Sequence, residues 1–311
     1  MGRIFGTDGI RGVAGVDMTP ELALDLGRAA ATVVKERGCA HPHFLIARDT
    51  RISGDMLESA IAAGLCSMGA DVTLLGVITT PGVAYLAQER GADGAFVISA
   101  SHNPYEYNGI KLFDGEGFKF PDSYEEEIEE LILDDLRMYA LVDEADFGRV
   151  YRDEGARGDY VRYIASTAPA RAEGIRVLVD CANGAASTTA ARLFETVGAD
   201  YTLLHAEPNG VNINLGCGST HVEQLCPLVV EGGYDLGIAF DGDADRIIAV
   251  DERGEVVDGD MLLAIFACYL ISQDKLAQRT VVGTVMSNIG FLKFGEMSDI
   301  NIETTKVGDR Y

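Results

Sequence analysis

The sequence predicts an α/β protein built from tandem, repeated three-layer α/β/α domains with mixed sheets, in which the third copy is incomplete. Three observations lead to this expectation. Apolar runs typical of buried strands alternate with amphipathic helical segments along the chain. One such unit recurs later in the sequence. In both copies a polar loop follows the equivalent buried strand, so we expect the repeated unit to supply candidate functional residues as well as a repeated fold.

The repeat is clearest in one short motif. Gly-Ala-Asp-Val-Thr-Leu-Leu at 69–75 recurs as Gly-Ala-Asp-Tyr-Thr-Leu-Leu at 198–204. Upstream of each lie an apolar strand, a polar loop and a helix, and downstream lie a second helix and a second buried strand. A third copy starts at 280–283 and reaches a strand at 302–305. We therefore expect domains at 1–154, 155–255 and 256–311, with the chain ending inside the third.

The first copy shows the signals that define its elements. Thr19 is a predicted cap for a helix that starts with proline and runs from 20 to about 37. A strand at 44–47, a polar loop and a helix at 53–68 follow. The acidic stretch at 125–135 is interleaved with apolar residues, which indicates a solvated amphipathic helix without a binding role.

Composition excludes several classes of partner. The 311 residues include 25 Lys and Arg against 49 Asp and Glu, a net charge of −24, so nucleic acid and anionic membranes are poor partners. An anionic substrate would need a local cluster of Arg and Lys. The 6 cysteines lack CxxC pairing, and no run has the length or flanks of a signal peptide or membrane span. We expect reduced thiols, a cytoplasmic location and a small-molecule partner, with a homodimer as a possible assembly.

The first candidate loop is Ser-Ala-Ser-His-Asn-Pro at 99–104, called the serine loop below. It follows a buried strand at 95–98, and open α/β sheets bind ligands at such strand ends. Taken alone, it could be a turn whose side chains bond their own backbone. A hydrolase nucleophile is disfavoured because no G-x-S-x-G surrounds Ser101 and the adjacent His102 cannot easily fold back as a base. Ser101 is the predicted nucleophile and Ser99 the alternative.

The second candidate loop, 241–246, follows the apolar run at 236–240 and is called the acid loop below. Its alternating Asp241, Asp243 and Asp245 can converge on one hard cation, and Mg²⁺ suits an all-oxygen site with open positions. An EF-hand is excluded because Arg246 stands where that loop needs glycine. A plain acidic turn is disfavoured because three uncompensated carboxylates would repel one another.

A serine beside a metal-binding triplet suits phosphoryl transfer, because the metal neutralises charge on the moving group. Lys111 lies a few residues after the serine loop and could transfer a proton or pair with phosphate. The glycine-rich stretch at 5–12 can bring backbone amides and Arg11 close to an anion. The sequence therefore favours a phosphoryl-transfer site at the meeting point of two repeated units.

These motifs together resemble the α-D-phosphohexomutases. The resemblance runs the length of the chain, through the stretches 5–12, 48–51, 99–104 with 108–111, 217–220, 241–246 and 306–311. The forms Ser-Ala-Ser-His-Asn-Pro and Gly-Thr-Asp-Gly-Ile-Arg-Gly favour the glucosamine branch of the family over its phosphomannomutase and phosphoglucomutase branches.

The resemblance implies reversible conversion of α-D-glucosamine 6-phosphate to the 1-phosphate, for UDP-N-acetylglucosamine synthesis. It implies a phosphoserine and a glucose or glucosamine 1,6-bisphosphate as activator or intermediate. The implied catalytic residues are Ser101, Lys111 and Arg11. The implied ligands of one Mg²⁺ per chain are Ser101, Asp241, Asp243 and Asp245. The implied substrate-binding residues are Arg246, His102, Lys306, Val307, Gly308 and Asp309.

The resemblance also implies four domains, and the sugar loop and the fourth domain of the family have no counterpart before Tyr311. We therefore expect a chain cut within its third domain. Three alternatives remain open: a mannose or glucose phosphomutase, an inactive fragment that binds Mg²⁺ and sugar phosphate, and a scaffold without a metal site.

Overall fold

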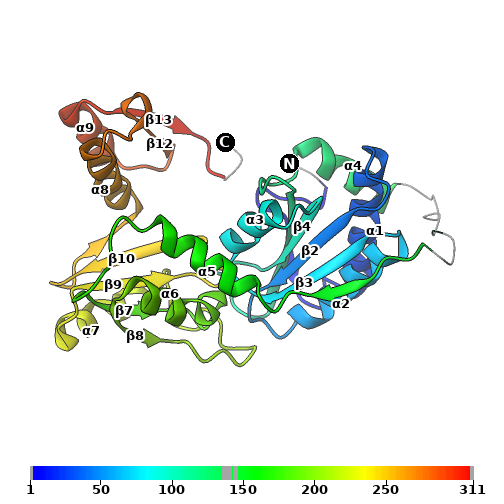
Figure 1. Cartoon of the computed structure of the whole chain (residues 1–311), viewed down its shortest axis with the longest axis horizontal. Helices are drawn as coiled ribbons and strands as arrows, with labels where there is room; N and C mark the ends of the chain where they lie inside the picture. Colours follow the sequence, from blue (N-terminus) through cyan, green and yellow to red (C-terminus); the bar gives the residue numbers. More distant parts are fainter. Residues whose placement is uncertain (1–2, 135–141, 143–145, 309–311) are drawn as a thin grey trace.

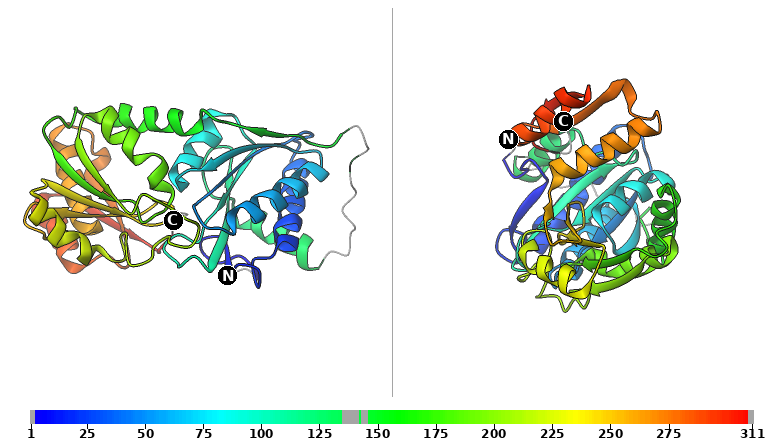
Figure 2. Two further views of the ribbon diagram at one scale, coloured as in Figure 1. Left: turned by 90° about the horizontal axis from the view of Figure 1, so that it is seen from below. Right: turned by 90° about the vertical axis from the view of Figure 1, so that its left-hand side faces the viewer.

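The computed structural model describes residues 3–134, 142 and 146–308. Two mixed sheets and a smaller parallel sheet follow one another along the chain, each flanked by helices (Figure 1). The predicted series of tandem α/β/α units is therefore confirmed. Viewed from below, the first two units lie side by side, and the strands of both sheets run toward their junction (Figure 2).

The first sheet has six strands in the order β1-β5-β4-β2-β3-β6. Strands β4, β2, β3 and β6 pair in parallel, whereas β5 pairs antiparallel with both β4 and β1. The serine loop therefore joins a parallel strand to an antiparallel one. The strand bounds are β1 Ile10–Val13, β2 His43–Arg48, β3 Asp71–Val77, β4 Gly94–Ile98, β5 Tyr107–Asp114 and β6 Val150–Arg152.

Helices cover both faces of this sheet. Thr19 Oγ1 accepts a 3.2 Å hydrogen bond from the amide of Leu22, which confirms the predicted cap of the first helix. One core lies between the sheet and α1, α2 and α4, and a second lies beneath α3 and α5. Tyr160 of α5 belongs to this second core, so α5 packs on the first sheet. The helix bounds are α1 Pro20–Glu36, α2 Gly54–Ser67, α3 Thr80–Glu89, α4 Asp122–Leu133 and α5 Ala156–Thr167.

The second sheet repeats the topology of the first with the order β11-β10-β9-β7-β8. Strands β9, β7 and β8 pair in parallel, as β4, β2 and β3 do, and β10 pairs antiparallel with β9 as β5 does with β4. The acid loop thus joins β9 to β10 at the position where the serine loop joins β4 to β5. The bounds are β7 Arg176–Asp180, α6 Ala190–Val197, β8 Asp200–Leu204, α7 Leu225–Gly232, β9 Leu236–Phe240, β10 Ile247–Asp251 and β11 Val256–Val257.

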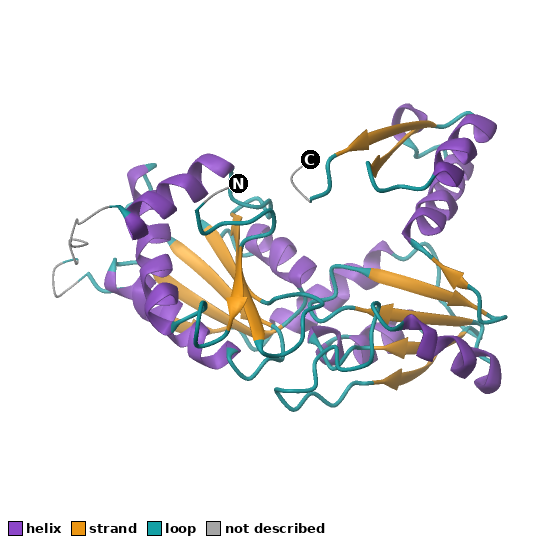
Figure 3. Cartoon of the chain, turned by 180° about the vertical axis from the view of Figure 1, so that it is seen from behind, coloured by secondary structure: helices purple, strands orange, loops and turns teal. Residues whose placement is uncertain are grey.

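The third unit holds two parallel strands and two helices. The side chain of Asp258 caps the first helix by accepting a 2.9 Å hydrogen bond from the amide of Met261. Figure 3 shows this unit standing beside the second sheet, with its last strand directed back toward the N-terminal segment. The bounds are α8 Gly259–Ser272, β12 Thr280–Thr284, α9 Ile289–Ser298 and β13 Asn301–Thr305.

Within the described residues, the longest apolar helices fall short of what is needed to cross a bilayer. All six cysteines are free thiols.

Candidate active site

Ser101 sits in a left-handed turn directly after β4, with φ 53°. Its amide donates a 2.9 Å hydrogen bond to Ser99 Oγ, and Ser99 Oγ in turn donates to Asp49 at 2.7 Å. The Ser99 hydroxyl is therefore buried and already engaged, which disfavours it as the alternative nucleophile. The turn leaves Ser101 as the hydroxyl that faces the second unit.

The Arg51 side chain holds the serine loop through hydrogen bonds to its backbone carbonyls. Its guanidinium donates to the carbonyls of Ser101 at 2.9 Å, Asn103 at 2.8 Å and Tyr107 at 2.9 Å, and also to the carbonyl of Pro104. Its Nε lies 2.9 Å from the Asp49 carboxylate, and both side chains are fully buried. The five donors of a guanidinium suit such a set of diverging carbonyls. The stretch 48–51 forms part of the family resemblance in the sequence, but the sequence predicted no role for Arg51.

Ser101 and Asp241 meet although the chain places them in different units. Ser101 Oγ donates a 2.5 Å hydrogen bond to Asp241 Oδ2. Both side chains are buried, at 0% and 1% exposure. The sequence predicted this meeting of the hydroxyl and the acid triplet.

The three carboxylates of the acid loop converge. Asp241, Asp243 and Asp245 each offer an oxygen, and these oxygens lie within 4.8 Å of one another. Burial, together with the charges of Asp243 and Asp245, raises the pKa of Asp241 to about 7. Asp243 Oδ1 is buried and has no hydrogen-bond partner among the described residues. A buried, unpaired carboxylate oxygen beside two others has the donor chemistry that Mg²⁺ requires.

Lys111 of β5 lies among carboxylates from both units. Its Nζ is 2.9 Å from Asp243, 3.1 Å from Asp245 and 3.3 Å from Asp8. Burial alone would lower the pKa of this amine, but the three carboxylates outweigh it and hold the pKa well above its usual value. Lys111 therefore stays charged, which favours the predicted pairing with phosphate over proton transfer.

Arg11 lies at the edge of the same cluster. It pairs with Asp8, whose pKa is held below its usual value because Lys111, Lys119 and Arg11 outweigh the effect of burial. The Arg11 Nε is buried and has no hydrogen-bond partner among the described residues. The glycine-rich stretch thus delivers a cation to the site, as its composition predicts.

His102 and Arg246 form a contact on the open side of the site. Arg246 Nη1 lies 3.3 Å from His102 Nδ1, and this nitrogen is 3.5 Å from Ser101 Oγ. The expectation that His102 cannot easily fold back toward Ser101 is therefore wrong. The left-handed backbone conformation of Ser101 places the His102 ring next to the Ser101 hydroxyl. Burial, Arg246 and Arg11 lower the pKa of His102, which favours the neutral ring. The Ser101 proton is donated to Asp241 rather than to this ring.

Asn214 and Gly242 bring the two loops together from the second unit, and sequence reasoning missed both. Asn214 donates hydrogen bonds of 2.8 Å to the Ser101 carbonyl and 3.0 Å to the Asn103 carbonyl. A Cβ on Gly242 would stand 2.6 Å from the Ser101 carbonyl oxygen, so only glycine permits this approach. The one signal available was the glycine inside the acidic triplet.

The loop after β13 carries the residues predicted to face the sugar. One described hydrogen bond in this loop runs from Thr305 Oγ1 to the Lys306 carbonyl at 3.1 Å. Asp309 lies outside the described residues. The sugar-facing role of these residues stays a prediction.

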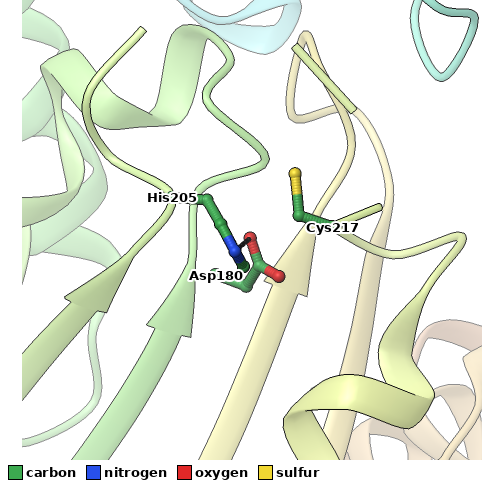
Figure 4. A group of neighbouring side chains, drawn as sticks. All are labelled: Asp180, His205 and Cys217. Carbon is green, nitrogen blue, oxygen red and sulfur yellow. Dashed lines mark ion pairs between the residues drawn. The ribbon is translucent and has the colours of Figure 1, made fainter. Parts of the chain in front are cut away.

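A second group of potential metal ligands, Asp180, His205 and Cys217, lies at the ends of strands in the second sheet (Figure 4). The Asp180 carboxylate accepts hydrogen bonds of 2.9 Å from the amides of Ala182 and Gly218, and lies 3.0 Å from His205 Nδ1. The Cys217 sulfur points away from this pair (Figure 4). Asp180 thus ties three loops together, a structural role that needs no metal.

A buried serine hydroxyl beside a convergent acid triplet, carried on two copies of one α/β/α unit, is the arrangement expected of a phosphohexomutase-type enzyme. Three family descriptions, "Phosphoglucomutase/phosphomannomutase, alpha/beta/alpha domain" I, II and III, match residues 2–137, 158–254 and 258–311. The chain therefore belongs to the phosphoglucomutase/phosphomannomutase family of enzymes.

Individual relatives narrow the comparison. A phosphoglucosamine mutase from Acetivibrio thermocellus is 51% identical over 311 residues, which cover 100% of this chain and 69% of the relative. Among solved structures, a phosphoglucomutase/phosphomannomutase family protein from Burkholderia thailandensis has a TM-score of 0.82 and 25% identity, covering 99% of this chain and 67% of its own. An N-acetylphosphoglucosamine mutase from Aspergillus fumigatus, in complex with GlcNAc-6P and magnesium, shares the fold with a TM-score of 0.62 at 16% identity, covering 100% of this chain and 64% of its own.

Proposed function

We propose that this chain interconverts α-D-glucosamine 6-phosphate and α-D-glucosamine 1-phosphate as a phosphoglucosamine mutase. The observation that carries the proposal is the 2.5 Å hydrogen bond from Ser101 Oγ to Asp241, which sets a hydroxyl beside the acid triplet. The 51% identity to a phosphoglucosamine mutase over the whole chain supports the choice of sugar. The product would enter UDP-N-acetylglucosamine synthesis.

The reaction runs through phosphorylated Ser101 and a 1,6-bisphosphate. The Oγ–P bond of phosphoserine breaks as the free sugar hydroxyl forms a new O–P bond, and the hydroxyl proton passes to Ser101 Oγ. After the bisphosphate reorients, Ser101 Oγ takes back the other phosphoryl group and the proton returns to the sugar oxygen. Such a transfer between two hydroxyls depends on in-line positioning and charge neutralisation. Glucose or glucosamine 1,6-bisphosphate serves as intermediate or activator.

One Mg²⁺ per chain fits the acid loop. Asp241, Asp243, Asp245 and an oxygen at Ser101 would hold it, and the buried Asp243 Oδ1 without a partner supports this set. When bound, the ion supplies charge neutralisation for the transferred phosphoryl group. The Aspergillus fumigatus N-acetylphosphoglucosamine mutase of the same fold is in complex with magnesium, which supports the choice of ion but not the ligand set.

The remaining residues bind and orient. Lys111, kept charged by its carboxylate neighbours, and Arg11 would pair with phosphate oxygens. Arg246 and His102, in contact on the open side of the site, would contact substrate. The sugar-facing group would be Lys306, Val307, Gly308 and Asp309.

The proposed domain boundaries are 1–154 for the unit with the serine loop, 155–255 for the unit with the acid loop and 256–311 for the sugar-recognition unit. We further propose a cytoplasmic location, which fits six free cysteines, and a homodimer. Fractionation and light scattering test these two proposals.

Intact-mass measurement tests the phosphoserine. Incubation with glucose 1,6-bisphosphate and Mg²⁺ should add one phosphoryl group to the chain, and Ser101→Ala should show none while Ser99→Ala keeps it. Conversion of glucosamine 6-phosphate should disappear in Ser101→Ala. Phosphorylation that persists in Ser101→Ala would contradict the mechanism.

A second candidate is a phosphomannomutase or phosphoglucomutase, favoured by the family description itself. Comparison of kcat/KM for glucosamine, mannose and glucose phosphates separates the three activities. Mg²⁺ and sugar-phosphate binding without turnover would favour a binding fragment.

A further inference from the structure

A cavity of about 320 Å³ lies between the first and second units, apart from the candidate active site. Its wall is made by the end of β3, the turn from β6 into α5, and the segment leading into α6. Figure 1 shows α5 spanning the two units above α6. None of the residues that line the cavity belongs to the serine loop or the acid loop.

Three arginines line this cavity in a chain whose net charge is −24. Arg152 ends β6, Arg157 lies in the first turn of α5, and Arg192 lies on α6. The guanidinium groups of Arg157 and Arg192 form no hydrogen bond or ion pair with any residue that the structure describes. In this acidic protein, Arg157 and Arg192 thus bring to one cavity two cations that have no partner among the described residues.

Two glycines make room for these guanidinium groups. A Cβ on Gly158 would stand 2.7 Å from Arg192 Nη1, so Arg192 lies directly over the first turn of α5. A Cβ on Gly76 would stand 3.5 Å from Arg157 Nη2, so Arg157 reaches back over the end of β3. Arg157 therefore reaches the cavity from α5, which packs on the first sheet, and Arg192 reaches it from α6, which packs on the second sheet.

The neighbouring acids leave the cavity positive. Asp153 also lines it, but its carboxylate is taken by Arg90 at 2.9 Å and by the Gly155 amide at 2.8 Å. Glu154 is the one other acid among the lining residues. The first turn of α5, which has no side-chain cap, adds the positive end of a helix.

We propose that this cavity binds the phosphate group of a small phosphorylated metabolite, held in the fork of Arg157 and Arg192 with Arg152 beside them. A phosphomonoester or diphosphate suits three guanidinium groups better than a single carboxylate does, because it carries more charge and offers at least three acceptor oxygens. The bound anion would bridge the two units next to Thr188, whose hydroxyl already donates to the Val77 carbonyl at 3.2 Å across the same junction. A bound anion would therefore stabilise the packing of the first unit against the second, on which the Ser101–Asp241 contact depends.

Calorimetric titration with inorganic pyrophosphate, without Mg²⁺, tests the site. We expect saturable binding to the wild type and a rise in its melting temperature when pyrophosphate is added. In Arg157→Gln/Arg192→Gln the affinity should weaken at least tenfold and the rise in melting temperature should be lost. The matched control is Arg171→Gln, an exposed arginine paired with Glu173 outside the cavity, which should bind as the wild type does. Arg246→Gln, in the candidate active site, should also keep this binding.

Two outcomes would overturn the proposal. In the first, Arg157→Gln/Arg192→Gln binds pyrophosphate as tightly as the wild type. In the second, Arg246→Gln loses the binding, which would show that the anion binds in the active site. Circular dichroism of each variant without ligand checks the fold. Arg157→Lys/Arg192→Lys keeps the charge but not the fork and should bind with intermediate affinity. The proposal does not depend on which sugar phosphate the enzyme uses.

Discussion

The Thr80 hydroxyl donates a 2.6 Å hydrogen bond to Asp243 Oδ2, while the Thr80 amide donates to the Asp243 carbonyl at 2.9 Å. Thr80 begins α3 of the first unit, and Asp243 is the central acid of the second. The first turn of one unit's helix thus holds the acid loop of the next. Together with Asn214 and Gly242, this contact positions two repeated loops as one site.

Substitution of Gly242 by alanine should separate the two loops. The added Cβ would stand 2.6 Å from the Ser101 carbonyl oxygen, a backbone atom that cannot move without shifting the serine loop. We expect Ser101 phosphorylation by glucose 1,6-bisphosphate to fall at least tenfold. Gly259→Ala is the matched control, because nothing lies within 4 Å of its added Cβ. Equal phosphorylation of both variants would mean that the loops need not approach this closely.

Thr80→Val should weaken the junction between the units. The change removes the hydroxyl donor of Asp243 Oδ2 and leaves Lys111 Nζ at 2.9 Å, and the loss of one hydrogen bond to a charged group costs about 1.5–3 kcal/mol. We expect a lower melting temperature by differential scanning calorimetry. Thr196→Val provides the comparison, since among the described residues that exposed hydroxyl bonds within its own helix, at 2.6 Å to the Arg192 carbonyl. A melting temperature as high as that of Thr196→Val would argue against the contact.

Arg51→Met should destabilise the first unit severely. It leaves the fully buried Asp49 carboxylate without its counterion and frees the serine-loop carbonyls, and such a loss costs about 3–5 kcal/mol. Asp49→Asn/Arg51→Met should recover part of the loss, as measured by thermal unfolding. Arg171→Met removes an exposed pair and should cost less than about 1 kcal/mol. Similar losses for Arg51→Met and Arg171→Met would contradict the anchoring role.

Mg²⁺ should stabilise the wild-type chain, and EDTA should reverse the effect. A ligand that binds only the folded state adds about 2.7 kcal/mol when present at 100 times its dissociation constant. Asp243→Asn should lose this gain, because it removes the charge of the carboxylate whose Oδ1 is unpaired. Asp299→Asn, a change at a highly exposed carboxylate, should keep it. The assignment fails if Mg²⁺ protects both variants equally.

Exposed cysteines should react with alkylating reagents faster than buried ones. Burial and the nearby Asp180 charge raise the pKa of both Cys181 and Cys217 to about 12. At pH 8 the thiolate fraction of each is then about 10⁻⁴, and only thiolates react. We expect iodoacetamide at pH 8 to label the exposed Cys268 first and to spare these two until the chain unfolds. Peptide mass spectrometry reads the order, and early labelling of Cys217 would contradict it.

The sequence predicted the repeated units and both loops because these features are local. A buried run followed by a polar turn is visible in a few residues, and the recurrence at 198–204 marks equivalent strands. The observed elements match closely: the helix expected at 20–37 is Pro20–Glu36, and the strand expected at 44–47 is His43–Arg48.

By itself, then, the sequence determined the order of the elements, the duplication, and the identity of Ser101 and the three aspartates as candidates. Only the tertiary structure decided which distant groups complete the site. Thr80 is 163 residues from Asp243, and Asn214 is 113 residues from Ser101. Hydrophobic periodicity reports which face of a strand or helix is buried, but hydrogen-bond partners and charge neighbours depend on how two packed units meet. The same reason explains why only the structure shows Lys111 among three carboxylates, which hold its pKa above its usual value.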